Sequence, residues 1–359
     1  MKEIFKDKSI LVTGGTGSLG KTLVKRILSE EYGLVKKLIV FSRDEAKQHA
    51  MRLSYENSKS ATDEITYNNF NRLLEFRIGD VRSFSDIASA MKDVDIIINA
   101  AALKQVPSSE YFPMQALKTN CEGASNIVNA ISELNLKVET VVCISTDKAC
   151  KPVNVMGLTK SLQERIFLSA NILNPKTRFI GVRYGNVFAS RGSVIPLFHD
   201  QIKSGGPVTI TVPSMTRFLL TLNQAVDTVC EAINHAKAGE IFVPRVPASS
   251  VLNLAKALIG ERDIEIKITG IRPGEKLHEI MISDEEAPYA RESGEFYAIS
   301  SMLPELHSFS DNSFPSAIDK EFSSENSVVS LEDTIKLLKQ NSLMIEDQQD
   351  NIGSEEFLT

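Results

Sequence analysis

Short apolar runs alternate, in the first half of the chain, with longer segments that have the spacing of amphipathic helices. The apolar runs are SILVT (9–13), KLIVF (37–41), LLEFRIG (73–79), DIIINAAA (95–102), TVVCIS (140–145) and RFIGVRYG (178–185). Each run has the length of a strand, and intervening segments such as 20–30 and 114–133 are long enough for crossover helices. The pattern predicts an α/β fold with a doubly wound parallel sheet covered by helices on both faces.

Beyond Tyr184 the rhythm loosens, and a smaller lobe is expected there. Its predicted elements are a strand entry at 205–211, a helix at 223–236 and a strand at 264–270. We therefore expect a main domain at 1–185 and a lobe at 186–285, some of whose elements return to the main domain.

The end of the chain changes character. Residues 286–329 are rich in Ser, Pro and Asp, and Ser330 with Asp333 is predicted to cap a short helix. The segment after Gln340 contains five acidic residues and no Lys or Arg. These patterns predict a C-terminal extension at 286–340 and a disordered acidic tail at 341–359.

Composition narrows the classes of function. Hydrophobic residues make up 42% and charged residues 24% of 359 positions, as in an ordinary globular protein. The net charge of -6 argues against a general nucleic-acid-binding surface and against an anionic membrane face. A charged N-terminus and the lack of a long apolar stretch predict a cytoplasmic protein without membrane insertion. The cysteines show no CxxC pair and no metal-type spacing with the histidines, so we expect buried reduced thiols and no metal.

A glycine-rich segment, LVTGGTGSLGKTLV (11–24), joins the first predicted strand to the first predicted helix. Backbone amides at a helix N-terminus attract phosphate, and glycines allow a pyrophosphate to approach closely. A simple tight turn would show the same local pattern. Because GDVRS (79–83) and NAAA (99–102) follow the third and fourth strands, a Rossmann-type dinucleotide site is favoured over the tight turn.

The second predicted strand ends in FSRDEAKQ (41–48), which bears on the choice of cofactor. Arg43 suits a 2′-phosphate, whereas Asp44 suits a free ribose hydroxyl, so the choice depends on which side chain faces the cofactor. Both residues are also compatible with solvated loop charges. We favour NADP over NAD.

Several further motifs narrow the class of protein. They are AALKQVPSSEYFPMQALKTN (101–120), STDKACKPVNVMGLTK (145–160), RYGNVFASRGSVIPLF (183–198), PSMTRF (213–218) and RPGEKLHE (272–279). With the glycine-rich loop and Lys160, they resemble the extended short-chain dehydrogenase/reductases. Within that superfamily the chain is similar, from about Ser9 to Glu286, to the UDP-N-acetylglucosamine 4,6-dehydratases of the polysaccharide biosynthesis family, and most to the inverting type.

The resemblance implies a reaction and roles for three residues. Hydride leaves C4 of the sugar for NADP, water is lost across C5 and C6, and the hydride returns to C6. Asp147 would be the acid for the departing C6 hydroxyl, Lys148 the base at C5, and Lys160 the partner of the nicotinamide ribose. An amine is a base only if its pKa falls, and we expect burial or the cations Lys104 and Lys160 to lower it. The acid role of Asp147 requires desolvation or a proton passed on when substrate binds.

Met156 stands four residues before Lys160, where the superfamily usually has a tyrosine. The spacing keeps both side chains on one helix face, but a thioether carries no proton. By itself a methionine there is more simply read as core packing. The group that deprotonates the C4 hydroxyl therefore stays open among Thr146, Asp147, Lys148 and a water.

The resemblance also implies two sets of contacts, and we expect the substrate to be UDP-N-acetylglucosamine or a close UDP-sugar. Expected cofactor contacts are Thr13, Gly14, Gly15, Thr16, Gly17, Ser18, Leu19, Gly20, Ser42, Arg43, Asp44, Lys47, Asp80, Val81, Ala100, Ala101, Ala102, Lys104, Asn120 and Lys160. Expected substrate contacts are Lys104, Asn186, Arg191, Ser193, Val194, Thr209, Thr211, Met215, Arg217, Arg272 and Glu275. His278 is expected to be structural.

Two other functions stay open. A UDP-sugar 4-epimerase shares the fold and the oxidation at C4, but it usually needs the tyrosine and does not need Asp147 and Lys148. A non-catalytic NADP-binding protein would have no use for this pair or for the arginines on the sugar side. A homo-oligomer is expected, with the 114–133 segment as a pairing surface common in the superfamily.

Overall fold

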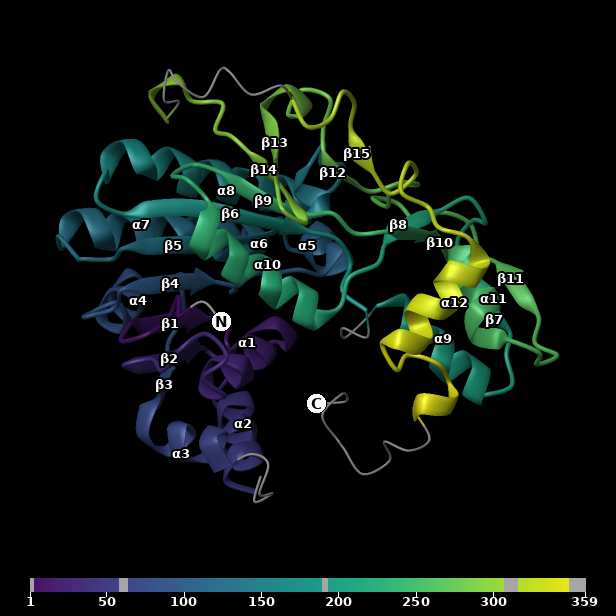
Figure 1. Ribbon diagram of the computed structural model, residues 1–359, viewed down its shortest axis with the longest axis horizontal. Helices are drawn as coiled ribbons and strands as arrows, with labels where there is room; N and C mark the ends of the chain where they lie inside the picture. Colours follow the sequence, from purple (N-terminus) through teal and green to yellow (C-terminus); the bar gives the residue numbers. More distant parts are fainter. Residues whose placement is uncertain (1–2, 58–63, 189–192, 307–315, 349–359) are drawn as a thin grey trace.

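The computed structural model describes residues 3–57, 64–188, 193–306 and 316–348 (Figure 1). Its central feature is a nine-stranded sheet with the order β13-β14-β9-β6-β5-β4-β1-β2-β3. The strands are β1 (Ser9–Thr13), β2 (Lys37–Ser42), β3 (Leu74–Ile78), β4 (Ile96–Asn99), β5 (Thr140–Thr146), β6 (Arg178–Tyr184), β9 (Ile241–Pro244), β13 (Ala290–Ser293) and β14 (Phe296–Ile299). Within this sheet, neighbouring strands pair in parallel along the order β9-β6-β5-β4-β1-β2-β3. Strand β14 pairs antiparallel with β9, and β13 pairs antiparallel with β14.

Helices cover both faces of this sheet, because each helix carries one apolar face. One face is covered by α1 (Ser18–Leu28), α2 (Glu45–Asn57), α3 (Glu64–Leu73) and α10 (Leu222–His235). The opposite face is covered by α4 (Phe84–Ala90), α7 (Gly123–Glu133) and α8 (Val155–Leu173). The strand order reverses between β1 and β4, which is where open α/β sheets bind ligands. The predicted doubly wound α/β fold is confirmed.

The six predicted strands of the first half are all present, with two local differences from expectation. Strand β4 ends at Asn99, so residues 100–102 leave the sheet as a loop. The segment expected as one long helix is divided into α6 (Pro113–Leu117), a π-helical turn η2 (Lys118–Glu122) and α7. Shorter elements are α5 (Val106–Tyr111), η3 (Asp147–Ala149), η4 (Ala287–Tyr289), η5 (Pro304–Leu306) and η7 (Glu346–Gln348).

A smaller lobe packs around its own apolar core, on the right in Figure 1. It contains α9 (Val194–Lys203), β7 (Val208–Ile210), β8 (Thr216–Phe218), β10 (Ala248–Ser250), α11 (Val251–Ile259), β11 (Ile266–Ile268) and α12 (Leu331–Gln340). The predicted strands at 205–211 and 264–270 are β7 and β11, which pair in parallel. The predicted helix at 223–236 is α10, which returns to the main sheet.

The C-terminal extension is integrated into both parts of the molecule. Its strands β13 and β14 complete the main sheet, and β15 (Phe322–Ser323) pairs with β12 (Ile280–Ile282). The Ser330 hydroxyl accepts a hydrogen bond from the backbone N–H of Asp333, which confirms the predicted cap of α12. Leu343 and Ile345 are buried in the core of the lobe, so the beginning of the predicted disordered tail is packed. Residues 349–359 of that tail lie outside the described residues.

Candidate active site

A cleft of about 1100 Å³ lies at the carboxyl edge of the parallel strands and is also lined by the smaller lobe. Loops that follow β1, β2, β3, β4, β5 and β6 all contribute to its walls. Most of the predicted site residues meet here. They are Gly14, Thr16, Gly17, Ser18, Leu19, Gly20, Ser42, Arg43, Asp44, Lys47, Asp80, Val81, Ala100, Ala101, Ala102, Lys104, Thr146, Lys148, Met156, Lys160, Asn186, Ser193, Val194, Thr209, Thr211, Met215, Arg217, Arg272 and Glu275.

The glycine-rich turn brings the N-terminus of α1 to the cleft. Gly14 has φ +66°, and a Cβ there would lie 2.8 Å from the carbonyl oxygen of Ala100, so the turn needs glycine at this place. The backbone N–H of Gly17 donates to the oxygen of Gly14, and α1 starts directly after it. Helix α1 therefore presents its N-terminus to the cleft, which favours binding of a phosphate.

Three of the predicted cofactor residues do not line the cleft, and two of them support its walls from behind. The Thr13 hydroxyl donates to Asn99 Oδ1 (2.6 Å) and accepts from the backbone N–H of Ala101 (3.2 Å). Gly15 does not line the cleft, and a Cβ there would lie 3.0 Å from Val40 Cγ1. Asn120, in the π-helical turn, is buried and pairs with the backbone of Leu103 and with Thr159. The side chains of Thr13 and Asn120 hold the loop after β4, and none of the three residues belongs to the cleft lining.

The loops after β2 and β3 carry the charges expected near the adenosine part of a dinucleotide. Asp44 uses its carboxylate to cap α2, because it accepts from the backbone N–H of Lys47 (3.0 Å) and from Lys47 Nζ (3.2 Å). Arg43 lies 3.9 Å from Asp80 and its side chain is 59% exposed. Asp80 itself is bound by Arg82 (2.6 Å). Of the two side chains considered for the cofactor ribose, the Asp44 carboxylate therefore caps α2, whereas the Arg43 guanidinium faces solvent.

The residues Asp147 and Lys148 follow β5 directly, in the turn η3. Asp147 is fully buried and lies behind the cleft lining; its Oδ1 accepts from the Thr146 hydroxyl (2.8 Å) and from Lys148 Nζ (3.0 Å). Its Oδ2 has no hydrogen-bond partner among the described residues. Burial, above all, and the nearby Glu279 raise the pKa of Asp147 above its usual value. The desolvation that an acid role requires is therefore present.

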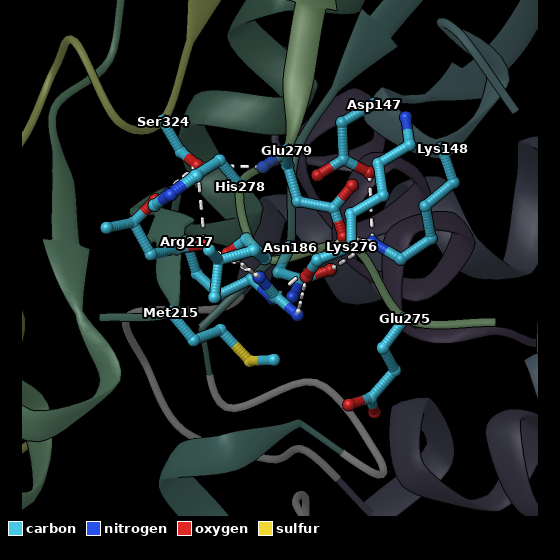
Figure 2. Close-up of polar contacts among 12 residues, drawn as sticks. Asp147, Lys148, Asn186, Met215, Arg217, Glu275, Lys276, His278, Glu279 and Ser324 are labelled. Atoms are coloured by element: carbon cyan, nitrogen blue, oxygen red, sulfur yellow. Dashed lines mark hydrogen bonds and ion pairs between the residues drawn. The ribbon is translucent and has the colours of Figure 1, made fainter. Parts of the chain in front are cut away.

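The surroundings of Lys148 differ from the expectation. Its ammonium lies 3.0 Å from three oxygens, one each of Asp147, Asn186 and Glu279 (Figure 2). Burial lowers its pKa, but the two carboxylates outweigh this effect, and the pKa is raised above its ordinary value. The expected lowering by Lys104 and Lys160 is wrong, because Asp147 and Glu279 outweigh both burial and the cation Arg217, which acts on the ammonium.

Glu279 belongs to the site although the sequence reasoning gave it no role. It lines the cleft, is 1% exposed, and has Arg217 Nε at 3.9 Å in addition to Lys148. Burial raises its pKa, but Lys148 and Arg217 overcome this and lower it, so the carboxylate is charged. In the sequence, only its place in the motif RPGEKLHE indicated that Glu279 belongs to the site. Its burial next to Lys148 depends on how two distant segments pack.

Met156 and Lys160 share one face of α8, as the spacing predicts, and both are buried at the cleft. Lys160 Nζ donates to the oxygens of Ile144 and Gln163. Burial lowers the pKa of Lys160. Gly157 allows the helix to approach this closely, since a Cβ there would collide with the carbonyl oxygen of Lys148. At position 156 this face thus carries a thioether, which holds no proton.

On the lobe side, two of the three arginines predicted to bind the substrate lie in the described residues, and their contacts differ. Arg272 has a side chain that is 69% exposed and lies 4.0 Å from Glu275. Arg217 is buried, and its guanidinium donates to the carbonyl oxygens of Thr216, Lys276 and Leu277. Arg217 is therefore a brace for the 276–277 segment as well as part of the cleft wall. Arg191 lies outside the described residues.

The remaining expectations concern side chains away from the cleft. His278 pairs with the Thr216 hydroxyl (2.8 Å), as expected for a structural histidine. The four cysteines are buried and free, as predicted.

Over the part of the chain that the structure describes, there is no cluster of three His, Cys, Asp or Glu suited to a metal. No helix of the described residues is long and apolar enough to cross a membrane.

Comparison with known proteins decides the family. A family model described as polysaccharide biosynthesis protein matches residues 10–301. The chain belongs to this family. The polysaccharide biosynthesis family implied by the motifs is thereby confirmed, and the match covers the main sheet, the cleft and most of the lobe.

Similar proteins by sequence include several named UDP-glucose 4-epimerase, and similar solved structures include both epimerases and a dehydratase. A protein of Rickettsia bellii (strain OSU 85-389) named UDP-glucose 4-epimerase is 46% identical over 301 residues, 82% of this chain and 84% of that protein. Pen from Bacillus thuringiensis has a similar structure, with 34% identity, TM-score 0.82, and 95% of this chain and 99% of that chain covered. The structure of DesIV, a dTDP-glucose 4,6-dehydratase from Streptomyces venezuelae with NAD and TYD bound, is also similar. Its sequence is 17% identical, its TM-score is 0.63, and the match covers 93% of this chain and 97% of that chain. At this identity the likeness shows the fold alone.

Proposed function

We propose that this family member is an NADP-dependent UDP-N-acetylglucosamine 4,6-dehydratase that releases a UDP-4-keto-6-deoxy-N-acetylhexosamine with inversion at C5. The enzyme would act in the cytoplasm, in the biosynthesis of surface polysaccharides or glycans. One observation carries the proposal: a buried Asp147 of raised pKa touches Lys148 at the carboxyl end of β5, beside Met156 instead of a tyrosine. Elimination of water needs an acid for the C6 hydroxyl and a base at C5, and Asp147 and Lys148 can supply these two groups, whereas epimerisation at C4 needs neither a C5 base nor a C6 acid.

The residues of the cleft fit a dinucleotide and divide the work of elimination. NADP would supply a hydride acceptor at C4 and a hydride donor at C6. Gly14 and the start of α1 would hold its phosphates, and Lys160 its nicotinamide ribose. Asp147 would give a proton to the departing C6 hydroxyl, and Lys148 would take the C5 proton. Lys148 must first lose a proton and Asp147 must gain one, because in the free protein the ammonium donates to Asp147 and Asn186 and forms an ion pair with Glu279; passage of the proton from Nζ to the Asp147 carboxylate, 3.0 Å away, would prepare both groups.

A second candidate is a UDP-sugar 4-epimerase, which the names of the relatives at 44–46% identity favour. Those relatives show shared ancestry over the cleft but not a shared product. Epimerisation keeps the mass of the sugar and inverts C4, whereas dehydration removes one water. A homo-oligomer also remains a proposal, supported by exposed Met114 at the start of the 114–133 segment and exposed Leu134 directly after it.

The deciding experiment is product analysis with purified protein and UDP-N-acetylglucosamine. We expect a product lighter by one water, with a C4 ketone and a C5 centre of inverted configuration in NMR spectra taken before it isomerises. UDP-glucose tested in parallel is expected to be a poor substrate. A product of unchanged mass that is the C4 epimer would establish the second candidate and overturn the first.

The choice of cofactor gives a separate prediction. Arg43→Ala should weaken NADP binding by roughly 10- to 100-fold and leave NAD binding almost unchanged, since a hydrogen bond to a charged group contributes about 1.5–3 kcal/mol. Calorimetric titration of both cofactors measures this. Arg52→Ala is the matched control, because Arg52 lies on α2 over the ring of Phe76 and outside the cleft. Equal affinities of the unmodified protein for NADP and NAD would remove the argument from Arg43.

A further inference from the structure

We propose that Glu279 is the positioning residue of Lys148: it fixes the ammonium in the cleft and keeps it protonated until substrate binds. The inference deepens the proposed function and rests on it for the role of Lys148 in catalysis. Glu279 precedes β12, and its Oε1 lies 3.0 Å from Lys148 Nζ. Its other oxygen, Oε2, is buried without a hydrogen-bond partner among the described residues.

A buried carboxylate of this kind requires an explanation beyond stability. Burying an ion pair costs much of the solvation of both charges, and a well-packed apolar pair is often at least as stable. The side chains of Lys148 and Glu279 are only 19% and 2% exposed, yet both line the cleft. Perturbed, paired charges that face a cleft are typical of functional sites.

The geometry around Lys148 shows what Glu279 contributes. An ammonium has three N–H donors, and here they meet Asp147, Asn186 and Glu279 at 3.0 Å each. Asp147 and Asn186 follow β5 and β6 of the main sheet. Glu279 alone approaches from the segment that leads into β12 (Figure 2). Without Glu279, only the two acceptors Asp147 and Asn186 would hold Nζ, and the Lys148 side chain would be less constrained.

The C-terminal extension holds Glu279 in place. The backbone N–H of Glu279 donates to Ser324 Oγ (2.9 Å), and the backbone N–H of Ser324 donates to the oxygen of Glu279 (2.8 Å). The Ser324 hydroxyl also pairs with Thr216 Oγ1 (2.7 Å), and Ser324 is fully buried. A segment far from β5 in sequence therefore determines where the third acceptor of Lys148 lies.

Charge gives Glu279 its second role. The charged groups that face Lys148 are Asp147 from η3, Glu279 from the start of β12, and Arg217 from β8. The neutral acceptor is Asn186. Replacing Glu279 with glutamine keeps an oxygen near Nζ but removes one of the two negative charges, so Lys148 should lose its proton at lower pH.

The test measures the ionisation of Lys148 without turnover. Only a neutral amine reacts with acetic anhydride, so the pH dependence of acetylation at Lys148, followed by mass spectrometry, reports the proton on Nζ. In Glu279→Gln we expect the profile to move to lower pH, with roughly tenfold faster labelling at a fixed pH below the midpoint, equivalent to one pKa unit. Glu292→Gln is the matched control, because Glu292 pairs with Arg245 on the exposed face of β13. An unchanged profile in Glu279→Gln overturns the inference.

Two further variants keep the test decisive if Glu279→Gln folds poorly, as judged by circular dichroism. Glu279→Asp retains the charge and should keep the profile near that of the parent. Ser324→Ala loosens Glu279 and should move the profile in the same direction as glutamine, but less. If Asp behaves like Gln, or if Ser324→Ala has no effect, the assigned role of charge or of the extension is wrong.

Turnover separates this inference from the proposed function. If the parent protein dehydrates UDP-N-acetylglucosamine, the rise of kcat/KM with pH should shift in Glu279→Gln in the same direction as the acetylation profile. A loss of rate at every pH without such a shift would indicate a purely structural role and would overturn the inference. If the parent does not dehydrate this substrate, the proposed function fails, while the acetylation profile still decides whether Glu279 controls Lys148.

Discussion

Replacing Lys148 with alanine is expected to stop the release of dehydrated product while leaving cofactor binding intact. Oxidation at C4 and proton removal at C5 involve different atoms of the sugar, so the variant should accumulate some reduced cofactor. General-base catalysis typically contributes ~10²–10⁴ in rate, and a loss of that size is expected. Product mass and absorbance of the reduced nicotinamide measure the two steps separately.

Solvent deuterium gives the second measurement for Lys148→Ala. Normal turnover in heavy water should place deuterium at C5, and the variant should leave that position unlabelled. Because the change strands Asp147 and Glu279 in a buried site, Lys148→Met and a urea unfolding curve are included to separate lost chemistry from lost structure. Lys151→Ala is the matched control, since Lys151 binds Asp284 and Glu321 at the surface. Labelling and dehydration at the parent rate in Lys148→Ala would contradict the assignment.

The second large effect is expected on stability, at Arg183. This side chain is 1% exposed and forms two-pronged ion pairs with Glu164 of α8 and with Glu286, and it donates to the oxygen of Met281. Removing one partner of a buried charge network leaves uncompensated charges and costs about 3–5 kcal/mol. Arg183→Met should lower the free energy of unfolding by about this amount in urea titrations. Arg245→Met, at an exposed pair with Glu292, should change it by less than about 1 kcal/mol.

The pH dependence of this effect follows from Glu286. Burial raises its pKa, but the charge of Arg183 outweighs burial and holds the pKa at about 2, below its ordinary value of 4.5. A carboxyl group with a lowered pKa contributes stability above the unfolded-state value, and this contribution is lost as pH falls toward the folded-state value. The difference between parent and Arg183→Met should therefore be largest near neutral pH and should shrink between about pH 4.5 and 2. A difference that stays constant over this range would contradict the role given to Arg183.

The sequence by itself determined the six parallel strands of the first half and most of the cofactor side of the cleft. Apolar runs such as SILVT and TVVCIS specify buried strands, and the glycine-rich turn is a local property that needs no distant partner. Because parallel strands place their carboxyl ends at one edge, the residues after β1, β4 and β5 had to meet there. Met156 and Lys160 share a face for an equally local reason, the helical repeat.

Only the tertiary structure determined which charges surround Lys148 and how the C-terminal extension contributes to the sheet and the site. Strands β13 and β14 are short, and only their pairing with β9 makes them part of the main sheet. Glu279 and Ser324 reach Lys148 and each other across long stretches of sequence. A pKa depends on burial and on charges in space, so the sequence showed Lys148 as a candidate base but not the carboxylates that keep its proton in place.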